Sequence, residues 1–425
     1  MLKDTLVKRL TLLVLLLAVL YALFLYLGGK PQLSRESLNA LSVVPSEKTY
    51  RLSFDRPVRR VEVFVEQAGQ RKELFRADMS EPSREVVFSL RPKEMSLREG
   101  KARLVLKASS GFLQGRSFVI ETLVDFTPPV LRVVAYTPSP SVGGSFALKV
   151  RSEEGAQVSL TYGGRRYALY PIGEGYYAGL FPVRIEEPLH SAKVEATDRA
   201  GNTSHHLLSL KVKQVKFAQD DIKLEEPLIE RVIYPLLGQE GKGLGPVEAF
   251  KRVNEVWRAR DVKRLEEIAT KSGPKVLWEG AFSQLPNSKV LAGYGELRHY
   301  FYRGQKVSES RHMGFDFASV ERAPVPASNS GVVVFAGDLG VYGNTVIIDH
   351  GMGLMSLYGH LSEIGVKKGQ FVKKGEQIGW TGVSGLALGD HLHFGILLQG
   401  YEVNPKEWLD PKWVKTHITQ VLQAR

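Results

Sequence analysis

Residues 331–348, GVVVFAGDLGVYGNTVII, contain two short runs rich in β-branched residues. The runs Gly331–Phe335 and Thr345–Ile348 are separated by glycine-rich sequence, which is typical of buried strands joined by turns. A third strand is predicted at His391-Leu-His-Phe394. These patterns predict a β-rich C-terminal domain, which we place at residues 281–425.

Histidines gather in this domain: six of the ten in the chain lie between His299 and His393. Two spacings are even, His312-Met-Gly-Phe-Asp316 and His391-Leu-His393. Because side chains at i, i+2 and i+4 share one face of a strand, each pair can point at a common centre. Three nitrogen or oxygen ligands with one open position are the arrangement of catalytic zinc. His312, Asp316 and His393 would make that set.

The stretch from about Arg298 to Trp408 resembles the lysostaphin-type or LytM zinc peptidases of bacterial cell walls. The matching blocks are His312-Met-Gly-Phe-Asp316, Pro326-Ala327 with Gly331-Val-Val, Gly343-Asn-Thr-Val-Ile-Ile-Asp-His-Gly351, Tyr358-Gly-His-Leu-Ser362, Gly369-Gln-Phe-Val-Lys-Lys-Gly375 and Gly389-Asp-His-Leu-His-Phe394. The resemblance implies a LytM-type peptidase domain and zinc as the cofactor. It makes His312, Asp316 and His393 the metal ligands and His360 and His391 the catalytic histidines. It also implies that the substrate is the peptide part of peptidoglycan.

Two positions depart from the family's usual sequence. Gly395 stands where a glutamate is common after the His-Leu-His-Phe block, and Asp390 precedes the histidine pair where proline is frequent. Neither position replaces a ligand, but both bear on how the groups around the ligands orient the imidazoles. His350, in Asp-His-Gly, fits a position without a metal role, and we interpret it as structural.

Two other functions fit parts of the sequence. Some proteins of the family have lost the metal and act as wall-binding proteins or as activators of a cell-wall amidase, and such proteins are expected to lack ligands. Here all three ligands and both catalytic histidines are present. The segment Val366–Gly375 also resembles a lipoyl-type carrier turn, a function that would leave the histidines without a role. The zinc content of the protein separates these alternatives.

Helices are predicted between residues 217 and 280, before the peptidase domain. Val247, Phe250, Val253 and Trp257 recur at intervals of three and four residues behind Gly245-Pro246. Val262, Leu265 and Ile268 continue this amphipathic pattern. The aromatic side chains are expected to pack in a core. The whole segment before the peptidase domain, which includes these helices and the β modules upstream of them, is expected either to restrain that domain, by supplying an Asn, Asp or Glu oxygen to the open metal position, or to act as a spacer.

Two β modules are predicted upstream of the helices, at residues 31–126 and 127–216. Alternating runs such as Val61–Val65 and Ala102–Leu106 indicate half-buried strands in the first module. Asp125-Phe-Thr-Pro-Pro129 separates the modules, because two prolines interrupt the strand pattern. In the second module Gly163-Gly164 predicts a two-residue hairpin turn. Thr197-Asp-Arg-Ala-Gly-Asn202 resembles the closing turn of bacterial immunoglobulin-like modules, so both modules are expected to be β-sandwiches.

The first thirty residues predict a cytoplasmic N-terminus and a transmembrane anchor. The run Leu10–Leu27 is uncharged and long enough, with Gly28 and Gly29, to span a bilayer core of about 30 Å. Lys3, Lys8 and Arg9 precede it, so the body is expected in the periplasm of a cell with an inner membrane. A cleaved signal peptide is the alternative, but its apolar region is usually shorter, about 7–15 residues, and an A-x-A-like site follows it, whereas here GGKPQLSRES follows.

The composition bounds the expected partners. The chain has no cysteine, so any metal site must use other ligands, and its net charge is +12. With the body outside the cytoplasm, this charge suits the membrane surface and the wall better than a nucleic acid. Peptidoglycan, the cytoplasmic membrane and an unidentified regulatory protein are the expected partners.

Overall fold

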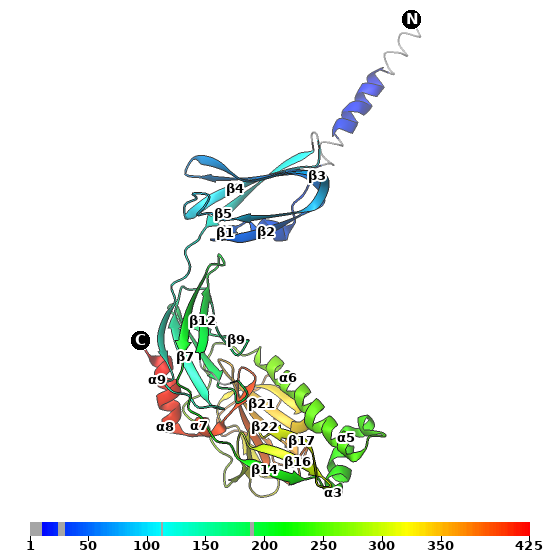
Figure 1. Cartoon of the computed structure of the whole chain (residues 1–425), viewed down its shortest axis with the longest axis vertical. Coiled ribbons are helices and arrows are strands. Elements are labelled where there is room, and N and C mark those ends of the chain that lie inside the picture. The colour runs from blue at the N-terminus through cyan, green and yellow to red at the C-terminus, as the bar shows by residue number, and fades with distance from the viewer. Residues whose placement is uncertain (1–10, 24–29, 112–113, 188–190) are drawn as a thin grey trace. The chain divides into compact units, whose positions relative to one another are not determined.

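The computed structural model describes residues 11–23, 30–111, 114–187 and 191–425 (Figure 1). These residues form a mainly β protein of several sheets, with a helical segment ahead of a β-rich C-terminal domain. The coarse fold class predicted from the sequence is therefore confirmed. The chain divides into two compact units, Met1–Pro129 with Thr197–Thr203, and Val130–Ala196 with Ser204–Arg425. The finer domain limits given above stay predictions.

The predicted transmembrane span Leu10–Leu27 lies only partly within the described residues. Residues 11–23 are helical, whereas residues 10 and 24–27 are outside the described part of the chain. None of the helices that the structure describes combines the length and the apolar character that crossing a bilayer requires. The membrane anchor thus stays a prediction.

The first unit is built on one five-stranded sheet. A short helix, α2 (Arg35–Ala40), is capped at its N-terminus by Ser34, whose side chain accepts a hydrogen bond from the Ser37 amide. The strands follow in the order β1-β5-β4-β2-β3. Their bounds are β1 (Val43–Val44), β2 (Lys48–Gln67), β3 (Gln70–Leu90), β4 (Gly100–Ser109) and β5 (Gly115–Val124).

The prediction of a two-sheet sandwich is wrong for this first module. Strands β2 and β3 are 20 and 21 residues long, and their pairing shifts register between Ser53 and Val58. Such irregularities bend a strand, so the single sheet curves around its own core (Figure 1). A second sheet is unnecessary because both halves of the long hairpin contribute to one hydrophobic cluster, with Leu52 and Val63 fully buried.

The second β module does form two packed sheets. Their strand orders are β10-β11-β7-β6 and β13-β12-β8-β9. The strands are β6 (Arg132–Tyr136), β7 (Ser145–Arg151), β8 (Gln157–Tyr162), β9 (Arg165–Ala168), β10 (Tyr170–Gly173), β11 (Tyr176–Pro182), β12 (Ser191–Thr197) and β13 (Thr203–Ser209). Side chains from both sheets share one core, including Leu148, Leu160 and Val194. The turn at Gly163-Gly164 is confirmed: Tyr162 pairs with Arg165, and both glycines have positive φ.

The helical segment begins with a strand that joins the C-terminal domain. Strand β14 (Gln219–Lys223) pairs in parallel with β16 (Leu297–Tyr302). The helical elements that follow are α3 (Glu226–Leu228), η1 (Ile229–Ile233), α4 (Tyr234–Leu237), η2 (Gly238–Gly241), α5 (Pro246–Lys251), η3 (Arg252–Trp257) and α6 (Arg258–Ala269). Phe250, Val253 and Trp257 pack in a core as predicted, whereas Val262 is 40% exposed.

The C-terminal domain contains the main sheet, with strand order β15-β18-β26-β22-β21-β20-β24 and β27 paired to β26. Two three-stranded sheets, β14-β16-β17 and β19-β25-β23, complete it. The elements are β15 (Lys289–Ala292), β17 (Gln305–Arg311), β18 (Phe315–Ala318), β19 (Pro324–Pro326), β20 (Gly331–Asp338), η4 (Gly340–Tyr342), β21 (Asn344–Gly351), β22 (Leu354–Gly359), β23 (Glu363–Ile364), β24 (Phe371–Val372), β25 (Gln377–Trp380), β26 (Leu392–Leu398), β27 (Tyr401–Val403), α7 (Pro405–Leu409), α8 (Pro411–Trp413), η5 (Val414–Thr419) and α9 (Gln420–Gln423).

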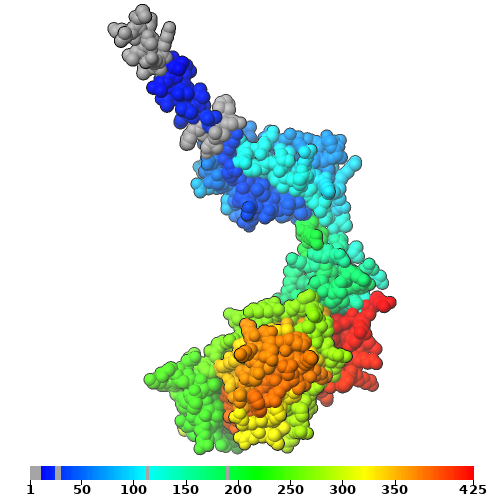
Figure 2. Space-filling view, turned by 180° about the vertical axis from the view of Figure 1, so that it is seen from behind, coloured from blue at the N-terminus to red at the C-terminus, as the bar shows by residue number. Residues whose placement is uncertain are grey.

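The sandwich and the C-terminal domain share a core within the second unit. Ala147, Ala178 and Leu180 of the sandwich belong to the same hydrophobic cluster as the main sheet and Trp408. The indole of Trp408 donates a hydrogen bond to Ser145 Oγ at 3.0 Å. The C-terminal helices, red in Figure 2, lie against strand β7. The sandwich is therefore packed on the domain that carries the histidines.

Candidate metal centre

A cavity of about 330 Å³ in the second unit contains the predicted site. The three predicted metal ligands and both predicted catalytic histidines line it. The helical segment contributes Ile222, Leu228, Phe250 and Arg258 to its wall. The sequence did not indicate this last feature, because it depends on β14 and the helices folding back onto the C-terminal domain.

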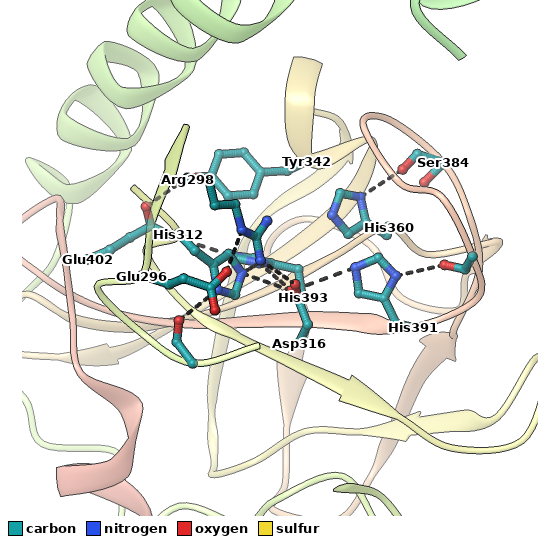
Figure 3. A network of polar contacts seen from close by, with 12 residues as sticks. Glu296, Arg298, His312, Asp316, Tyr342, His360, Ser384, His391, His393 and Glu402 are labelled. Atoms are coloured by element: carbon teal, nitrogen blue, oxygen red, sulfur yellow. Dashed lines mark hydrogen bonds and ion pairs between the residues drawn. The ribbon is translucent and has the colours of Figure 1, made fainter. Parts of the chain in front are cut away.

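His312, Asp316 and His393 converge on one point (Figure 3). One ligand atom from each lies within 4.8 Å of the others. His312 Nε2 lies 2.9 Å from Asp316 Oδ1 and 3.1 Å from His393 Nδ1, and His393 Nδ1 lies 3.1 Å from the same carboxylate oxygen. The structure thus brings together the three residues that the resemblance implied.

The expectation that each pair lies on one face of a strand explains only part of this convergence. Asp316 on β18 is the register partner of His393 on β26, so their side chains share one face of the main sheet. His312, however, follows the end of β17 and precedes β18, in the connection that contains Gly314. A Cβ on Gly314 would lie 2.6 Å from His393 Nε2, so only glycine fits between the two ligands. The expectation that His312 and Asp316 share one strand is therefore wrong, although the two side chains do meet.

The groups around the ligands determine their tautomers. His312 Nδ1 lies 2.9 Å from the Gly293 carbonyl oxygen, which can only accept, so this nitrogen carries the proton. Its Nε2 then directs a lone pair at Asp316 Oδ1, another acceptor. Two acceptors at 2.9 Å require a cation or an additional proton between them. Arg298 lies 3.5 Å from Asp316 Oδ2 and also pairs with Glu296, so it holds the carboxylate from its outer side.

The buried charges shift the pKa values of this cluster. Burial lowers the pKa of His312, which favours the neutral ring that a metal requires. Burial would raise the pKa of Asp316, but its close contacts with the His312 and His393 rings outweigh this effect and hold that pKa well below the usual range. Burial also acts to lower the pKa of His393, yet the neighbouring carboxylates of Asp316 and Glu402 raise it to about 9. Asp316 is therefore an anion that attracts positive charge to this point.

His360 and His391 lie side by side next to the cluster (Figure 3), with ring centroids 4.8 Å apart. His360 Nδ1 donates to the Ser384 carbonyl at 2.8 Å, and His391 Nδ1 donates to the Gly389 carbonyl at 2.7 Å. In the neutral form of each ring the lone pair is therefore on Nε2, and His391 Nε2 lies 3.6 Å from Asp316 Oδ1. Burial lowers the pKa of His360 to about 3, and the neighbouring His391 acts in the same direction, so the His360 ring is neutral at pH 7.

The backbone of His360 is unusual, because its φ is +61°, a region that costs energy for a residue with a side chain. Its amide donates to the Tyr342 carbonyl at 2.7 Å, which holds this conformation. Tyr342 is buried, and its ring lies 5.3 Å from that of His393. No spacing in the sequence indicated a role for Tyr342, Arg298 or Glu402.

The remaining histidines of this region lie away from the cluster. His350 is fully buried, with Nδ1 at 2.7 Å from the Ser330 carbonyl and Nε2 at 2.8 Å from Ser356 Oγ. Both ring nitrogens are thus used inside the scaffold. His299 contacts Asp221 on β14 at 3.1 Å.

Comparison with known proteins agrees with this geometry. The profile of "Peptidase family M23" matches residues 310–405. Residues 310–405 form an M23 peptidase domain. The ligands His312, Asp316 and His393 and the neighbouring His360 and His391 all lie within these limits.

Two curated relatives share this part of the chain. The DD-carboxypeptidase/endopeptidase Mpg of Neisseria meningitidis serogroup B is 44% identical over 134 residues, which are 31% of this chain and 30% of the relative. The peptidoglycan DD-endopeptidase ShyA of Vibrio cholerae is 45% identical over 93 residues, 22% of each chain. This chain thus spans less than a third of the length of either relative.

Two solved structures match part of this chain. The catalytic domain of the antimicrobial peptidase lysostaphin from Staphylococcus simulans is 33% identical, with a TM-score of 0.26, and the match covers 31% of this chain and 98% of that domain. A putative peptidase M23 from Pseudomonas aeruginosa is 21% identical with a TM-score of 0.43, covering 64% of this chain and 96% of that structure.

Proposed function

We propose that this protein is a zinc-dependent endopeptidase that hydrolyses peptide cross-links or stem peptides of peptidoglycan. The observation that carries the proposal is the convergence of His312 Nε2, Asp316 Oδ1 and His393 Nδ1 at separations of 2.9 to 3.1 Å. Two imidazoles and one carboxylate, with a side left open toward a cavity, are a ligand set of catalytic zinc. The acceptor atoms that face one another are compatible with a shared cation.

The residues beside the ligands fit a hydrolytic role. Zinc in such a site supplies Lewis acidity and lowers the pKa of water toward about 7. In their neutral form His360 and His391 carry the lone pair on Nε2, so one ring can accept a proton from water and pass it to the leaving amine. The other, once protonated, can stabilise negative charge on the carbonyl oxygen.

The names of the relatives support one class of bond. Mpg is described as a DD-carboxypeptidase/endopeptidase and ShyA as a peptidoglycan DD-endopeptidase, so both names include a DD-endopeptidase activity. We therefore infer a cross-link between two D-configured centres as the substrate. A non-catalytic role has no specific support, because no ligand is missing. The alternative of a lipoyl-type turn at Val366–Gly375 has none either, since this segment contributes β24 to the main sheet.

The cellular location follows from the substrate. Peptidoglycan lies outside the cytoplasm, and Leu10–Leu27 with the preceding Lys3, Lys8 and Arg9 favours an uncleaved anchor in the inner membrane with the body in the periplasm. Protease added to spheroplasts is expected to degrade residues 31–425. Complete protection of the body would rule this orientation out.

Two measurements on the full chain test the function. We expect one zinc ion per chain by metal analysis, and we expect the zinc-loaded protein to convert cross-linked fragments of purified wall into monomers, identified by mass. His312→Ala, Asp316→Ala and His393→Ala should each remove the metal, whereas His299→Ala, outside the cluster, should retain it. Undiminished zinc in all three variants would refute the ligand assignment. Full zinc with no wall hydrolysis would instead indicate a binding protein.

A further inference from the structure

Glu402 is a buried carboxylate for which the proposed reaction has no direct use. It lies on β27 and is 5% exposed. Its Oε2 accepts a hydrogen bond from the Tyr342 hydroxyl at 2.7 Å. Its Oε1 has no hydrogen-bond partner, and neither does His393 Nε2, which lies 3.6 Å away. These two buried polar atoms, neither of which has a hydrogen-bond partner, therefore face each other across a short gap (Figure 3).

Buried polar groups without partners are costly, so such a pair calls for an explanation. An imidazole N–H and a carboxylate oxygen are complementary, and a small approach would join them. The opposite nitrogen of the same ring, Nδ1, points at His312 and Asp316. His393 thus stands between the ligand cluster on one side and Glu402 on the other.

The position of Glu402 depends on a glycine in the neighbouring strand. Strands β26 and β27 are antiparallel, with Leu397 opposite Glu402. Gly395 lies two residues after His393 on β26, so the two share a face of the sheet. A Cβ on Gly395 would come within 3.1 Å of Glu402 Oε1. The missing side chain leaves the space that the Glu402 carboxylate uses to reach His393.

We propose that Glu402 is a positioning residue for the metal ligand His393. Its carboxylate accepts the Nε2–H of His393, which fixes the tautomer whose Nδ1 lone pair is free to bind the metal. A carboxylate behind a ligating histidine orients the ring and raises its basicity. This inference rests on the proposed metal site, and it adds Glu402 and its hydrogen-bond donor Tyr342 to the residues on which that site depends.

Tyr342 connects this pair to a catalytic histidine. Its hydroxyl holds Glu402, and its backbone carbonyl accepts from the His360 amide at 2.7 Å. The orientation of His393 and the strained backbone of His360 thus depend on one buried residue, the first through its side chain and the second through its carbonyl group. A change that displaces Tyr342 should disturb both, whereas a change at Glu402 should act on the metal through His393 alone.

The test compares metal affinity among variants of the full chain in detergent. Glu402→Gln keeps the size of the side chain but removes its charge, and we expect it to bind zinc about 10–100-fold more weakly in competition with a chelator. The absorption bands of the cobalt-loaded protein should shift as well, because they report ligand geometry. Glu407→Gln is the matched control, since Glu407 accepts from the Ser145 amide and does not line the site cavity.

The outcomes separate this inference from the metal site itself. Zinc-free wild-type protein would overturn the proposed function and this inference together. Tight zinc binding in the wild type, with unchanged affinity and an unchanged cobalt spectrum in Glu402→Gln, would overturn the role of Glu402 alone. If Glu402→Gln does not fold, NMR of the ring nitrogens in the zinc-loaded wild type decides. A proton on His393 Nε2 is expected, and a proton on Nδ1 would refute the proposal.

Discussion

His350 offers a quantitative test of the scaffold behind the site. It is fully buried between the Ser330 carbonyl and Ser356 Oγ, and its ring packs edge-on against Phe282 with centroids 4.8 Å apart. Burial lowers its pKa from 6.5 to about 4, opposed in part by the bond to Ser330. The folded protein therefore holds a neutral imidazole at a pH where the unfolded chain already takes up a proton.

The direction of the pH effect follows from this difference. Because the pKa of His350 is lower in the folded state, its contribution to stability is complete above pH 6.5 and decreases as the pH falls toward 4. One pKa unit corresponds to about 1.4 kcal/mol. Between pH 7.5 and pH 5, His350 should therefore cost the protein about 2 kcal/mol of unfolding free energy.

His350→Asn makes this contribution measurable. The amide retains a donor for the Ser330 carbonyl but loses the contacts of the ring, so the variant should be less stable by about 2–4 kcal/mol at pH 7.5. Asparagine does not titrate, so the difference from wild type should shrink by about 2 kcal/mol at pH 5. Urea unfolding at the two pH values gives both numbers.

A matched control is available on the same unit. His206 on β13 is exposed, so His206→Asn should change the unfolding free energy by the same small amount at both pH values. If His350→Asn and wild type differ by an equal amount at pH 7.5 and pH 5, the buried neutral imidazole is refuted. Zinc content should be unchanged in this variant, because His350 lies outside the ligand cluster.

Two further predictions concern the site and the helix packed behind it. His360→Ala and His391→Ala should keep most of the bound zinc but lose wall hydrolysis, since these residues move protons and do not hold the metal; near-normal hydrolysis in both variants would show that their roles are wrongly assigned. Gly340→Ala should lower the unfolding free energy by about 1–3 kcal/mol more than Gly369→Ala. Both glycines have positive φ, but a Cβ on Gly340 would lie 2.3 Å from the Asp261 carboxylate, whereas Gly369 faces open space. Equal losses in urea unfolding would contradict this packing.

Local sequence patterns were sufficient for the elements that form from neighbouring residues. The turn at Gly163-Gly164 and the buried positions Phe250, Val253 and Trp257 depend on residues a few positions apart. The single curved sheet of the first unit could not be predicted in the same way. It depends on β2 pairing with both β3 and β4, and the spacing of apolar residues does not reveal how many sheets the strands will form.

The site likewise combines residues that local sequence could predict with residues that it could not. Its ligand residues could be found because each pair is close in sequence and matches a familiar block. The groups that support the ligands come from distant parts of the chain: Glu402 meets Tyr342 across 60 residues, and Asp261 reaches the Val341 amide across 80. A buried glutamate or tyrosine has no recognisable spacing around it, so only the folded chain reveals these contacts.

The structure also changes the question of whether the upstream segment restrains the peptidase. One of the two alternatives was an Asn, Asp or Glu oxygen from that segment at the open metal position, but among the described residues no Asp or Glu outside the C-terminal domain joins the three ligands. The segment instead supplies part of the cavity wall through β14 and the helices. Restraint by this segment would therefore act by narrowing the access of substrate to the ligands.

Truncation would be a poor test of this idea. Removal of residues 1–275 would delete β14 and the helices, whose buried faces cover Tyr300, Met355 and Leu357. Loss of that much apolar contact would destabilise the domain itself. Any change in rate would then combine loss of restraint with loss of structure, so a single substitution in the cavity wall is more informative.

Leu228→Ala is the appropriate change, because Leu228 lines the cavity and is only partly buried in the helical core. If the wall restrains access, a shorter side chain should raise the hydrolysis of intact wall severalfold, while a small cross-linked peptide, which needs less space, should be cut at the wild-type rate. Val256→Ala removes a similar amount of apolar surface from the exposed side of the same segment, where the side chain is 51% exposed, and should change neither rate. The opposite result is equally informative. A higher KM for both substrates in Leu228→Ala would mean that the helical segment binds the peptide, and the restraint hypothesis would have to be abandoned.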